Sequence, residues 1–394
     1  MKNRDDILCP ACGGRDYEPV LELPGVPILC NVLIPEAAKA LRVPRGEIRL
    51  CLCRDCSHLF NDRFMPDLVV YGPDYENSLE FSKVFRMFAG RLARRLIEKY
   101  GLRGKKILEI GCGQGEFLEL MAVLGGNRCI GFDPAFQDGV ERRGLRTVSI
   151  FKQGFDPSRG ALPAADFVIC RHVLEHLADP ADFLRGIAKA VDVMKGMAFY
   201  MEVPNGEGLF RKQAVWDIIY EHPSHFTRTS LAVIFRRAGL PADISETYHG
   251  RYLYARSSAA VQSFAGGGTG KRLSARALCS RIDRIRTCGD NVSRWRNVLE
   301  KCRGAGQRTV LWGAGSKGVT FANLVSGNGE IQCVVDVNPR KQGMFLPGVG
   351  LPIIPPSSLR RVSPRFVIVM NRIYEREIRK TLEHLGLTPE LLFP

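Results

Sequence analysis

A glycine-rich segment after an apolar run constrains the fold of this chain more than any other feature. The run Lys106 to Ile110 is followed by Gly111, Gly113 and Gly115, and then by a helical pattern over 116–124. A short apolar run is typical of a buried parallel strand, and the glycines allow the backbone to pass close to a ligand where the helix begins. The segment therefore predicts a strand, a turn and a helix of an α/β fold.

An acidic residue follows the next predicted strand. Asp133 comes directly after the apolar run Cys129 to Phe132. It lies about twenty residues past the glycine turn, where a carboxylate can hold both ribose hydroxyls of an adenosine. This spacing predicts a nucleotide-cofactor site. A dinucleotide site or a merely tight turn is the alternative interpretation.

The order Glu-Ile-Gly-Cys-Gly-Gln-Gly over 109–115 resembles motif I of the class I S-adenosylmethionine-dependent methyltransferases. It resembles that motif more than the Gly-x-Gly-x-x-Gly pattern that cradles a dinucleotide pyrophosphate. The resemblance implies S-adenosylmethionine as the cofactor. The residues that it implies for cofactor binding here are Glu109, Gly111, Gly113, Gly115, Asp133 and Pro134.

A second segment of the same superfamily is visible further along. The predicted strand Ala165 to Cys170 is followed by Arg171-His-Val-Leu-Glu-His176, at the edge where open α/β sheets bind ligands. The resemblance implies that Arg171 and His172 neighbour the methionine part of the cofactor or the substrate. We expect a helix over 173–178, with His176 facing the sheet as a capping or packing residue.

Two cysteine pairs near the start predict a metal site. Cys9 and Cys12 form one Cys-x-x-Cys, and Cys53 and Cys56 form the other. Four thiolates of this kind make the closed tetrahedral site of structural zinc. Cys51 and His58 leave the fourth ligand open, and a set of unligated thiols is the alternative. Thirteen cysteines without a signal peptide favour reduced thiols and metal binding over a disulfide framework.

The whole pattern resembles the bacterial nucleotide-sugar C-methyltransferases, in which a zinc module, a methyltransferase core and a third α/β domain occur in this order. We expect the zinc-binding module over 1–66, the S-adenosylmethionine-binding core over 67–256 and the C-terminal domain over 257–394. A length of 394 residues suits two or three domains. The predicted fold class is α/β, with a Rossmann-like class I methyltransferase core between the zinc module and a doubly wound α/β domain.

The third domain repeats the strand, glycine turn and helix. Gly313-Ala-Gly315 follows an apolar run, and Asp336 ends the next one. Lys317 and Lys341 supply cations that suit the diphosphate of a nucleotide sugar, so these lysines and Asp336 are candidate substrate contacts. A nicotinamide site is one alternative, since glycine turns before helices suit any phosphate. A domain that only packs against the core is another.

The resemblance places catalysis in the segment 216–227. Relatives carry a Tyr-His-Glu-His-x-Ser-Tyr-Phe segment, whose Glu-His pair is implicated in removing a proton from carbon, and Glu221-His222 matches that pair. Tyr220 stands where the family has a histidine, and His225 replaces an aromatic residue. Glu221 and Tyr220 are candidate catalytic residues. His222 and His225 are left as competing bases, since a neutral histidine can abstract such a proton near neutral pH.

A polar and aromatic segment before the helix expected over 84–100 contains Tyr75, Asn77 and Ser78. Relatives place a lid there, which implies contacts with cofactor or sugar. An ordinary linker with helix capping is the alternative.

Charge and hydropathy limit the possible partners. The formal charge of +15 raises the question of RNA. The surplus is spread along the chain, and a nucleotide sugar also attracts cations, so a small-molecule substrate is expected rather than nucleic acid. No apolar run approaches the roughly 18–20 residues of a membrane span, which predicts a soluble cytoplasmic protein. The sequence leaves the oligomeric state open.

We expect methyl transfer to a carbon beside a ketone of a deoxy-sugar nucleotide. The alternatives are O- or N-methylation of another small molecule or polysaccharide precursor, RNA methylation, and nucleotide-sugar binding without catalysis.

Overall fold

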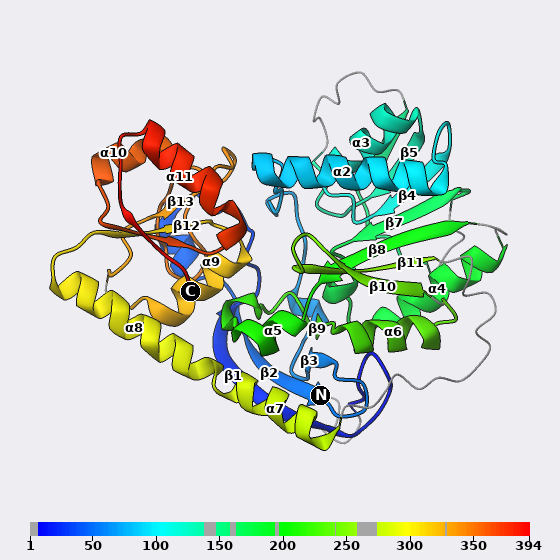
Figure 1. The fold of residues 1–394 in the computed structure, drawn as a ribbon, viewed down its shortest axis with the longest axis horizontal. Helices are drawn as coiled ribbons and strands as arrows, with labels where there is room; N and C mark the ends of the chain where they lie inside the picture. The colour runs from blue at the N-terminus through cyan, green and yellow to red at the C-terminus, as the bar shows by residue number, and fades with distance from the viewer. Residues whose placement is uncertain are drawn as a thin grey trace.

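The computed structural model describes residues 7–137, 147–157, 163–193, 197–240, 242–257, 274–327 and 329–394. Within these residues the strands form three sheets, which lie in the N-terminal, middle and C-terminal parts of the chain (Figure 1). The glycine-rich sequence over 257–270 predicts a mobile linker, and this segment falls almost entirely outside the described residues. No helix in the described part of the chain has both the length and the apolar character that a membrane span requires.

The N-terminal sheet has the strand order β1-β2-β3-β9, with antiparallel neighbours. The last strand, β9, belongs to the segment predicted to be catalytic. In this strand His225 and Ser224 pair with Leu59 and Phe60 of β3. The sheet therefore carries part of the candidate active site on its edge. Its elements are β1 (Tyr17–Pro27), α1 (Ala37–Leu41), β2 (Arg45–Cys53), β3 (Leu59–Asn61), η2 (Pro66–Leu68) and β9 (Ser224–His225).

The middle sheet has the order β10-β11-β8-β7-β4-β5-β6. The five strands from β8 to β6 are parallel to one another, and β11 and β10 extend the sheet as an antiparallel edge. The strands are β4 (Lys106–Ile110), β5 (Arg128–Phe132), β6 (Val148–Phe151), β7 (Phe167–Arg171), β8 (Ala198–Pro204), β10 (Ala242–Thr247) and β11 (Tyr252–Ser257).

Helices cover both faces of this sheet. In Figure 1, α2 and α3 lie along one face and α4 and α6 along the other. Helix α2 begins because the Ser82 hydroxyl accepts a hydrogen bond from Phe85 N, and it ends at Gly101 in the left-handed conformation. The helices of this part are α2 (Lys83–Tyr100), α3 (Glu116–Gly125), η3 (Leu174–His176), α4 (Pro180–Val193), α5 (Glu207–Lys212), η4 (Val215–Asp217) and α6 (Arg228–Arg237).

The C-terminal sheet is wholly parallel, with the order β14-β13-β12-β15-β16. Its strands are β12 (Thr309–Trp312), β13 (Val334–Val335), β14 (Ile353–Ile354), β15 (Phe366–Val369) and β16 (Glu390–Leu392). Its helices are α9 (Ser316–Val325), η6 (Pro356–Ser358), α10 (Leu359–Val362), η7 (Arg372–Tyr374) and α11 (Glu375–His384). This arrangement supports the doubly wound domain that the sequence predicts.

Two helices link the outer parts. The arginine-rich stretch over 272–303 has a helix-like sequence, and within it the structure has α7 (Ala275–Arg286) and α8 (Cys288–Gly304), separated at Thr287. Figure 1 shows them running beneath the N-terminal sheet toward the C-terminal domain. They bury one apolar stripe, which includes Ile285, Val292 and Leu299.

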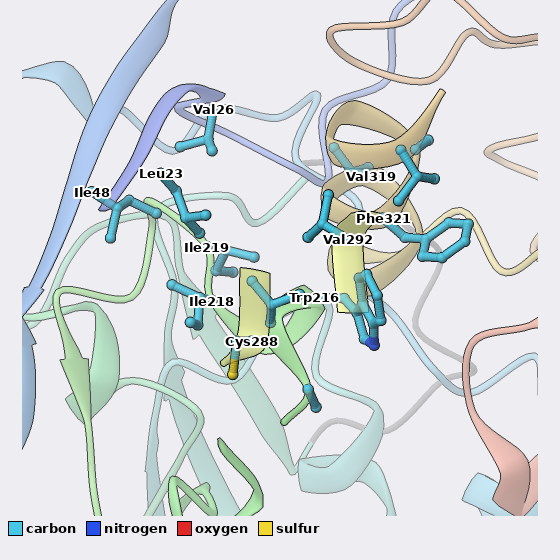
Figure 2. Packing of buried hydrophobic residues seen from close by; sticks show 14 of the residues in the cluster. Leu23, Val26, Ile48, Trp216, Ile218, Ile219, Cys288, Val292, Val319 and Phe321 are labelled. Atoms are coloured by element: carbon cyan, nitrogen blue, oxygen red, sulfur yellow. The ribbon is translucent and has the colours of Figure 1, made fainter. Parts of the chain in front are cut away.

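One hydrophobic core joins all three parts. Trp216 packs edge-on against Phe321, with ring centroids 5.0 Å apart, and neighbours Val292 in the same cluster (Figure 2). Leu23 and Ile48 of the N-terminal sheet belong to this cluster as well. Because truncating a buried aromatic side chain typically costs about 3–5 kcal/mol, this core holds the segment around Trp216 firmly between the domains.

Candidate active site

The glycine turn after β4 is left-handed at three positions. The φ angles of Gly111, Gly113 and Gly115 are 71°, 58° and 89°. A Cβ on Gly111 or Gly115 would lie 2.1 Å or 2.4 Å from a neighbouring side chain, so packing requires glycine there. A Cβ on Gly113 would meet nothing closer than 4.0 Å. The turn is therefore tight on two sides and open at Gly113, where a ligand can approach the backbone.

Asp133 ties the end of β5 to this turn. Its Oδ2 accepts a hydrogen bond of 2.8 Å from Gly113 N, and its Oδ1 accepts one of 2.8 Å from Ala135 N. Burial raises the pKa of the carboxyl group, while these two backbone donors oppose the rise. Pro134, between the two, is exposed.

Glu109 lies at the bottom of the same site. The residue is 2% exposed, and its Oε2 has no hydrogen-bond partner among the described residues. Burial raises the pKa of Glu109 to about 8. An orphaned buried carboxyl group beneath an open glycine turn fits a bound ligand with donors of its own, such as S-adenosylmethionine.

Arg171 ends β7 and His172 follows it, at the same edge of the sheet. The Arg171 guanidinium lies 4.3 Å from the centroid of the Phe117 ring, and its Nε lies 3.4 Å from Glu202 Oε1. The backbone of His172 is left-handed, with a φ of 57°. This conformation costs of order 1–3 kcal/mol in a residue other than glycine and is common at functional sites.

The ring of His172 lies between two buried carboxylates. Its Nδ1 is 3.4 Å from Glu175 Oε1, and its Nε2 is 3.1 Å from Glu202 Oε1. Burial alone would lower the pKa of His172, but these carboxylates outweigh burial and raise it to about 9. The two carboxylates therefore favour the protonated form of His172.

Three other histidines and a tyrosine form a cluster beside it. The ring centroids of His176 and His222 are 4.5 Å apart, and those of His222 and His225 are 6.1 Å apart. The Tyr71 hydroxyl lies 2.7 Å from His176 Nδ1. Burial lowers the pKa of His222 well below 6.5, with further lowering by His176, and burial lowers the pKa of His225 to about 4. His222 and His225 are therefore neutral at pH 7.

His176 does not face the sheet as expected. The sequence predicts a helix over 173–178, but the chain forms only the single turn η3 over residues 174–176. This turn directs His176 toward Tyr71 and His222. The apolar pattern around His176 suggested a packing role, and only the partners from distant segments place it at the candidate site.

Glu221 connects three segments of the chain. It is fully buried, its Oε1 accepts a hydrogen bond of 2.5 Å from Cys30 N, and its Oε2 accepts one of 2.5 Å from the Tyr75 hydroxyl. Burial raises the pKa of Glu221, while the nearby His176 and the two donors oppose the rise. The carboxyl group thus holds the candidate lid against the candidate catalytic segment.

The structure does not bring the Tyr220 hydroxyl to the histidines. The Tyr220 ring packs against Phe64, with centroids 5.5 Å apart, and fills the space where a Cβ on Gly46 would stand. Its hydroxyl accepts a hydrogen bond of 3.0 Å from Met65 N. Tyr220 directly precedes Glu221, so the backbone directs the two side chains to different surroundings, and Tyr220 anchors the segment in the N-terminal part.

The lid segment reaches the C-terminal domain through Glu76, which the sequence did not single out. Glu76 is 2% exposed and accepts hydrogen bonds from Asn338 Nδ2 (3.0 Å) and from Arg340 Nη1 (2.8 Å). The Ser78 hydroxyl donates to Glu116 Oε1 of α3 over 3.1 Å. Asn77 is exposed. A single acidic residue in a polar stretch gave no periodic signal that could have marked Glu76.

Asp336 repeats the geometry of Asp133. Its Oδ2 accepts a hydrogen bond of 2.7 Å from Ala314 N in the glycine turn, and its Oδ1 accepts one of 2.8 Å from Asn338 N. In the same turn, a Cβ on Gly318 would lie 2.0 Å from Gly313 O. The close packing of helix on turn is typical of nucleotide-binding α/β domains.

The two candidate lysines of this domain face different neighbours. Lys341 is 6% exposed, and its Nζ donates to Asn31 Oδ1 and to Ala314 O, each over 3.0 Å. Lys317 Nζ lies 2.5 Å from Asp217 Oδ1 of the core. Burial lowers the pKa of both, and that of Lys317 falls to about 8.

The four predicted cysteines come together. One sulfur atom from each of them lies within 4.8 Å of the others, with Sγ–Sγ distances of 3.6 Å for Cys9–Cys56 and 3.5 Å for Cys12–Cys53. His58 is not in this group, because its ring nitrogens lie 3.2 Å and 3.3 Å from serine hydroxyl groups. Four thiols at this spacing fit one tetrahedral metal ion.

Comparisons with known proteins agree with this architecture. Residues 83–243 match the family model of a methyltransferase domain, and residues 281–388 match that of a C-methyltransferase C-terminal domain. The chain is 25% identical to C-methyltransferase NovU of Streptomyces niveus over 399 residues, which cover 94% of this chain and 90% of that protein.

Other similarities cover part of the chain. The ubiquinone biosynthesis O-methyltransferase of Aeromonas salmonicida is 37% identical over 101 residues, which cover 23% of this chain and 40% of that protein. The solved structure of the mitomycin 7-O-methyltransferase MmcR has a TM-score of 0.37 and 18% identity, and the match covers 47% of this chain and 55% of that one. The two family models and the relative matched over nearly the whole chain show that the chain is a class I S-adenosylmethionine-dependent methyltransferase with a C-methyltransferase C-terminal domain.

Proposed function

We propose that this methyltransferase transfers the methyl group to a carbon beside a ketone of a nucleotide-linked deoxy-sugar, with His222 as the general base. The observation that carries the proposal is the state of His222: a neutral, partly accessible imidazole next to the buried Glu221. Transfer to carbon requires such a base, because the acceptor carbon becomes nucleophilic only after it loses a proton.

The neighbours of His222 suit this chemistry. In the proposed reaction the proton moves from the carbon to the imidazole of His222, and the electron pair of the broken C–H bond becomes an enolate whose carbon is nucleophilic. Bound S-adenosylmethionine would supply the methyl group for this carbon and leave as S-adenosylhomocysteine. Burial raises the pKa of the Tyr71 hydroxyl, so it stays protonated and can donate to a developing oxyanion. A positioned base is typically worth about 10² to 10⁴ in rate.

We assign the cofactor to the glycine turn after β4. The candidate cofactor residues at or beside this turn are Glu109, Gly111, Gly113, Gly115, Asp133 and Pro134, and Arg171 and His172 lie at the end of the adjacent strand β7. The cofactor supplies the electrophilic methyl group. The protein's part is to align the acceptor carbon with that group, which supplies much of the rate enhancement in reactions of two bound molecules.

The C-terminal domain is proposed to hold the nucleotide. Asp336, Lys317 and Lys341 lie around the turn before α9, and a helix N-terminus suits phosphate. Glu76 links this region to the lid that carries Tyr75. Asn77 and Ser78 of that lid are further candidate contacts. The domains in this proposal are 1–66, 67–256 and 257–394.

A structural zinc ion is proposed for the N-terminal module. Cys9, Cys12, Cys53 and Cys56 would supply the four thiolates of a closed site. Because β3 pairs with β9, a metal that orders this module also stabilises the strand that carries His225.

Hydrogen–deuterium exchange on carbon tests the reaction. The protein is incubated in heavy water with S-adenosylhomocysteine and candidate 4-keto nucleotide sugars, and NMR follows the proton beside the ketone. We expect exchange in the wild type, its loss in His222→Ala and its retention in His225→Ala. Cofactor binding, measured by calorimetry, should survive both substitutions.

Other outcomes would contradict the proposal in defined ways. Loss of exchange only in His225→Ala would make His225 the base. Cofactor binding without exchange of any candidate would leave an oxygen, a nitrogen or RNA as the acceptor, and binding of a nucleotide sugar without any methyl transfer would indicate a binding protein.

A further inference from the structure

A cavity lies on the outer face of the core, between α2 and the turn that joins β10 to β11. Its volume is about 170 Å³. Because one water molecule needs only about 10–15 Å³ of cavity volume, the cavity has room for a small molecule. The lining residues are Phe88, Arg91, Leu92, Arg95, Thr247, Tyr248 and His249. None of them belongs to the proposed active site, and no carboxylate is among them.

The two arginines of this cavity lack ion-pair partners among the described residues. Arg91, Arg95 and His249 are exposed, and within the part of the chain that the structure describes neither arginine has a hydrogen-bond or ion-pair partner. The acidic residue nearest to His249 in sequence is Glu246, whose Oε1 lies 3.7 Å from Arg211, and the one nearest to Arg95 is the exposed Glu98. Arg91 and Arg95 are four positions apart on a helix, so both side chains project from the same side of α2.

A third polar side chain, that of His249, stands on an unusual backbone. Tyr248, His249 and Gly250 are consecutive left-handed residues, with φ angles of 49°, 57° and 75°. Tyr248 and His249 are not glycines, so each costs of order 1–3 kcal/mol in this conformation, a cost that is typically tolerated at ligand sites. The turn is held in place by the Tyr248 ring, which packs 4.4 Å from Phe88.

A smaller adjoining cavity continues the basic surface. It shares Leu92 and Arg95 with the first cavity and adds Lys99 and Arg256. Arg256 lies 3.7 Å from Asp243 and is partly neutralised, whereas Lys99 extends the cationic row of α2 by one turn. A groove of this charge attracts anions.

We propose that the cavity between α2 and the β10–β11 turn binds the phosphate group of a small molecule, at a site separate from methyl transfer. Arg91 and Arg95 supply the guanidinium donors that pair with phosphate oxygens, and His249 supplies a third donor from the opposite wall. Phe88 and Tyr248 form a rigid aromatic floor beneath them.

The location also gives the site a physical connection to the rest of the molecule. The Tyr248 hydroxyl donates to the Tyr374 hydroxyl of the C-terminal domain over 3.0 Å. The Tyr248 ring stacks on Tyr252 at 5.2 Å, and Tyr252 in turn lies 4.5 Å from His172. A ligand bound against Tyr248 would therefore touch a side chain that contacts both Tyr374 of the C-terminal domain and Tyr252, the neighbour of His172.

Isothermal titration calorimetry of the full-length protein, saturated with S-adenosylhomocysteine, tests the site. Inorganic phosphate and glucose 1-phosphate are titrated separately into the wild type, into Arg91→Gln/Arg95→Gln, and into Arg94→Gln. Arg94 lies on the same helix and is also exposed, but it does not line the cavity, so Arg94→Gln is the matched control. We expect the double variant to lose one binding event or bind at least tenfold more weakly, and the control to match the wild type.

Several outcomes are decisive. Tighter binding of glucose 1-phosphate than of phosphate, lost in the double variant, identifies a phosphorylated metabolite as the ligand class, and equal affinity identifies the free anion. Unchanged binding in the double variant, or no saturable binding to the wild type, overturns the proposal. Cofactor affinity and thermal unfolding of the double variant should match the wild type, since both arginines are exposed and unpaired. The readout is binding alone, so it is independent of the proposed reaction.

Discussion

The Tyr75 hydroxyl donates a hydrogen bond of 2.5 Å to Glu221 Oε2, across 146 positions of sequence. Cys30 N donates to the other oxygen of the same carboxylate. A buried carboxylate with two donors is fixed in one orientation, and Glu221 therefore fixes the backbone that carries His222.

Removal of the Tyr75 hydroxyl should reduce catalysis without affecting the cofactor. In Tyr75→Phe, Glu221 keeps one donor but loses the other, and an unsatisfied buried acceptor costs about 1–3 kcal/mol. We expect kcat/KM to fall about 10- to 100-fold, with the Kd for S-adenosylmethionine unchanged. Steady-state kinetics and calorimetry measure the two quantities. Tyr100→Phe is the control, because it loses a hydroxyl hydrogen bond to Ser257 O at 3.2 Å, away from the histidines. An equal loss in both variants would contradict a specific role for Tyr75.

The pH dependence of the reaction should report His222. The base must be neutral to accept a proton, and burial lowers its pKa well below 6.5. We therefore expect kcat/KM to rise with pH through a midpoint below 6.5 and to stay level from there to pH 8. A pH–rate profile measures this directly. A midpoint at or above pH 7 would be incompatible with His222 in this environment.

His172 should make folding stability depend on pH in the alkaline range. Its folded pKa of about 9 lies above the ordinary value of 6.5, so its stabilising contribution is complete below pH 6.5 and is lost as the pH rises through 9. We expect the free energy of unfolding to fall between pH 8 and 9.5 in the wild type and to change less in His172→Gln. Urea unfolding at both pH values measures the difference, and equal slopes would show that His172 is not charged in the folded state. Glu109, with a pKa raised to about 8, contributes a loss in the same direction mainly below this interval.

The metal site should depend on Cys53 and not on Cys51. Both are buried in β2, but only Cys53 belongs to the group of four sulfur atoms. We expect about one zinc ion per chain in the wild type and in Cys51→Ala, and much less in Cys53→Ala, with a lower Tm, because the metal-binding free energy is part of the folding free energy. Elemental analysis and thermal unfolding measure both effects. Full zinc content in Cys53→Ala would refute the four-cysteine site.

The two equivalent carboxylates should serve two different ligands. Asp133 and Asp336 bind their glycine turns in the same way. We expect Asp133→Asn to weaken S-adenosylmethionine binding, and Asp336→Asn to raise the KM for the nucleotide sugar, each about 10-fold or more, since hydrogen bonds to charged groups contribute about 1.5–3 kcal/mol. Each variant is the control for the other. An effect of both variants on the same ligand would contradict the division between the domains.

The local sequence pattern was sufficient to predict the elements around the proposed cofactor site. The apolar run of β4, the glycines after it and Asp133 at the end of β5 occur where the sequence predicts them. These features depend on the backbone conformation of neighbouring residues and on strand burial, both of which leave a signal within a short window. The same holds for the turn before α9 and for the paired cysteines.

Long-range contacts decided the remaining part of the candidate site. His176 became a neighbour of His222 because η3 is only one turn long, and Tyr220 was directed into the N-terminal part because Gly46 leaves room for its ring. Glu76 gained partners more than 260 positions away, with separations of 262 and 264. The sequence by itself therefore determined the strands, the glycine turns and the types of residue available for chemistry, since these follow from local conformation and periodicity. Only the tertiary structure decided which of those side chains meet, because their contacts depend on how the three sheets pack around one shared core.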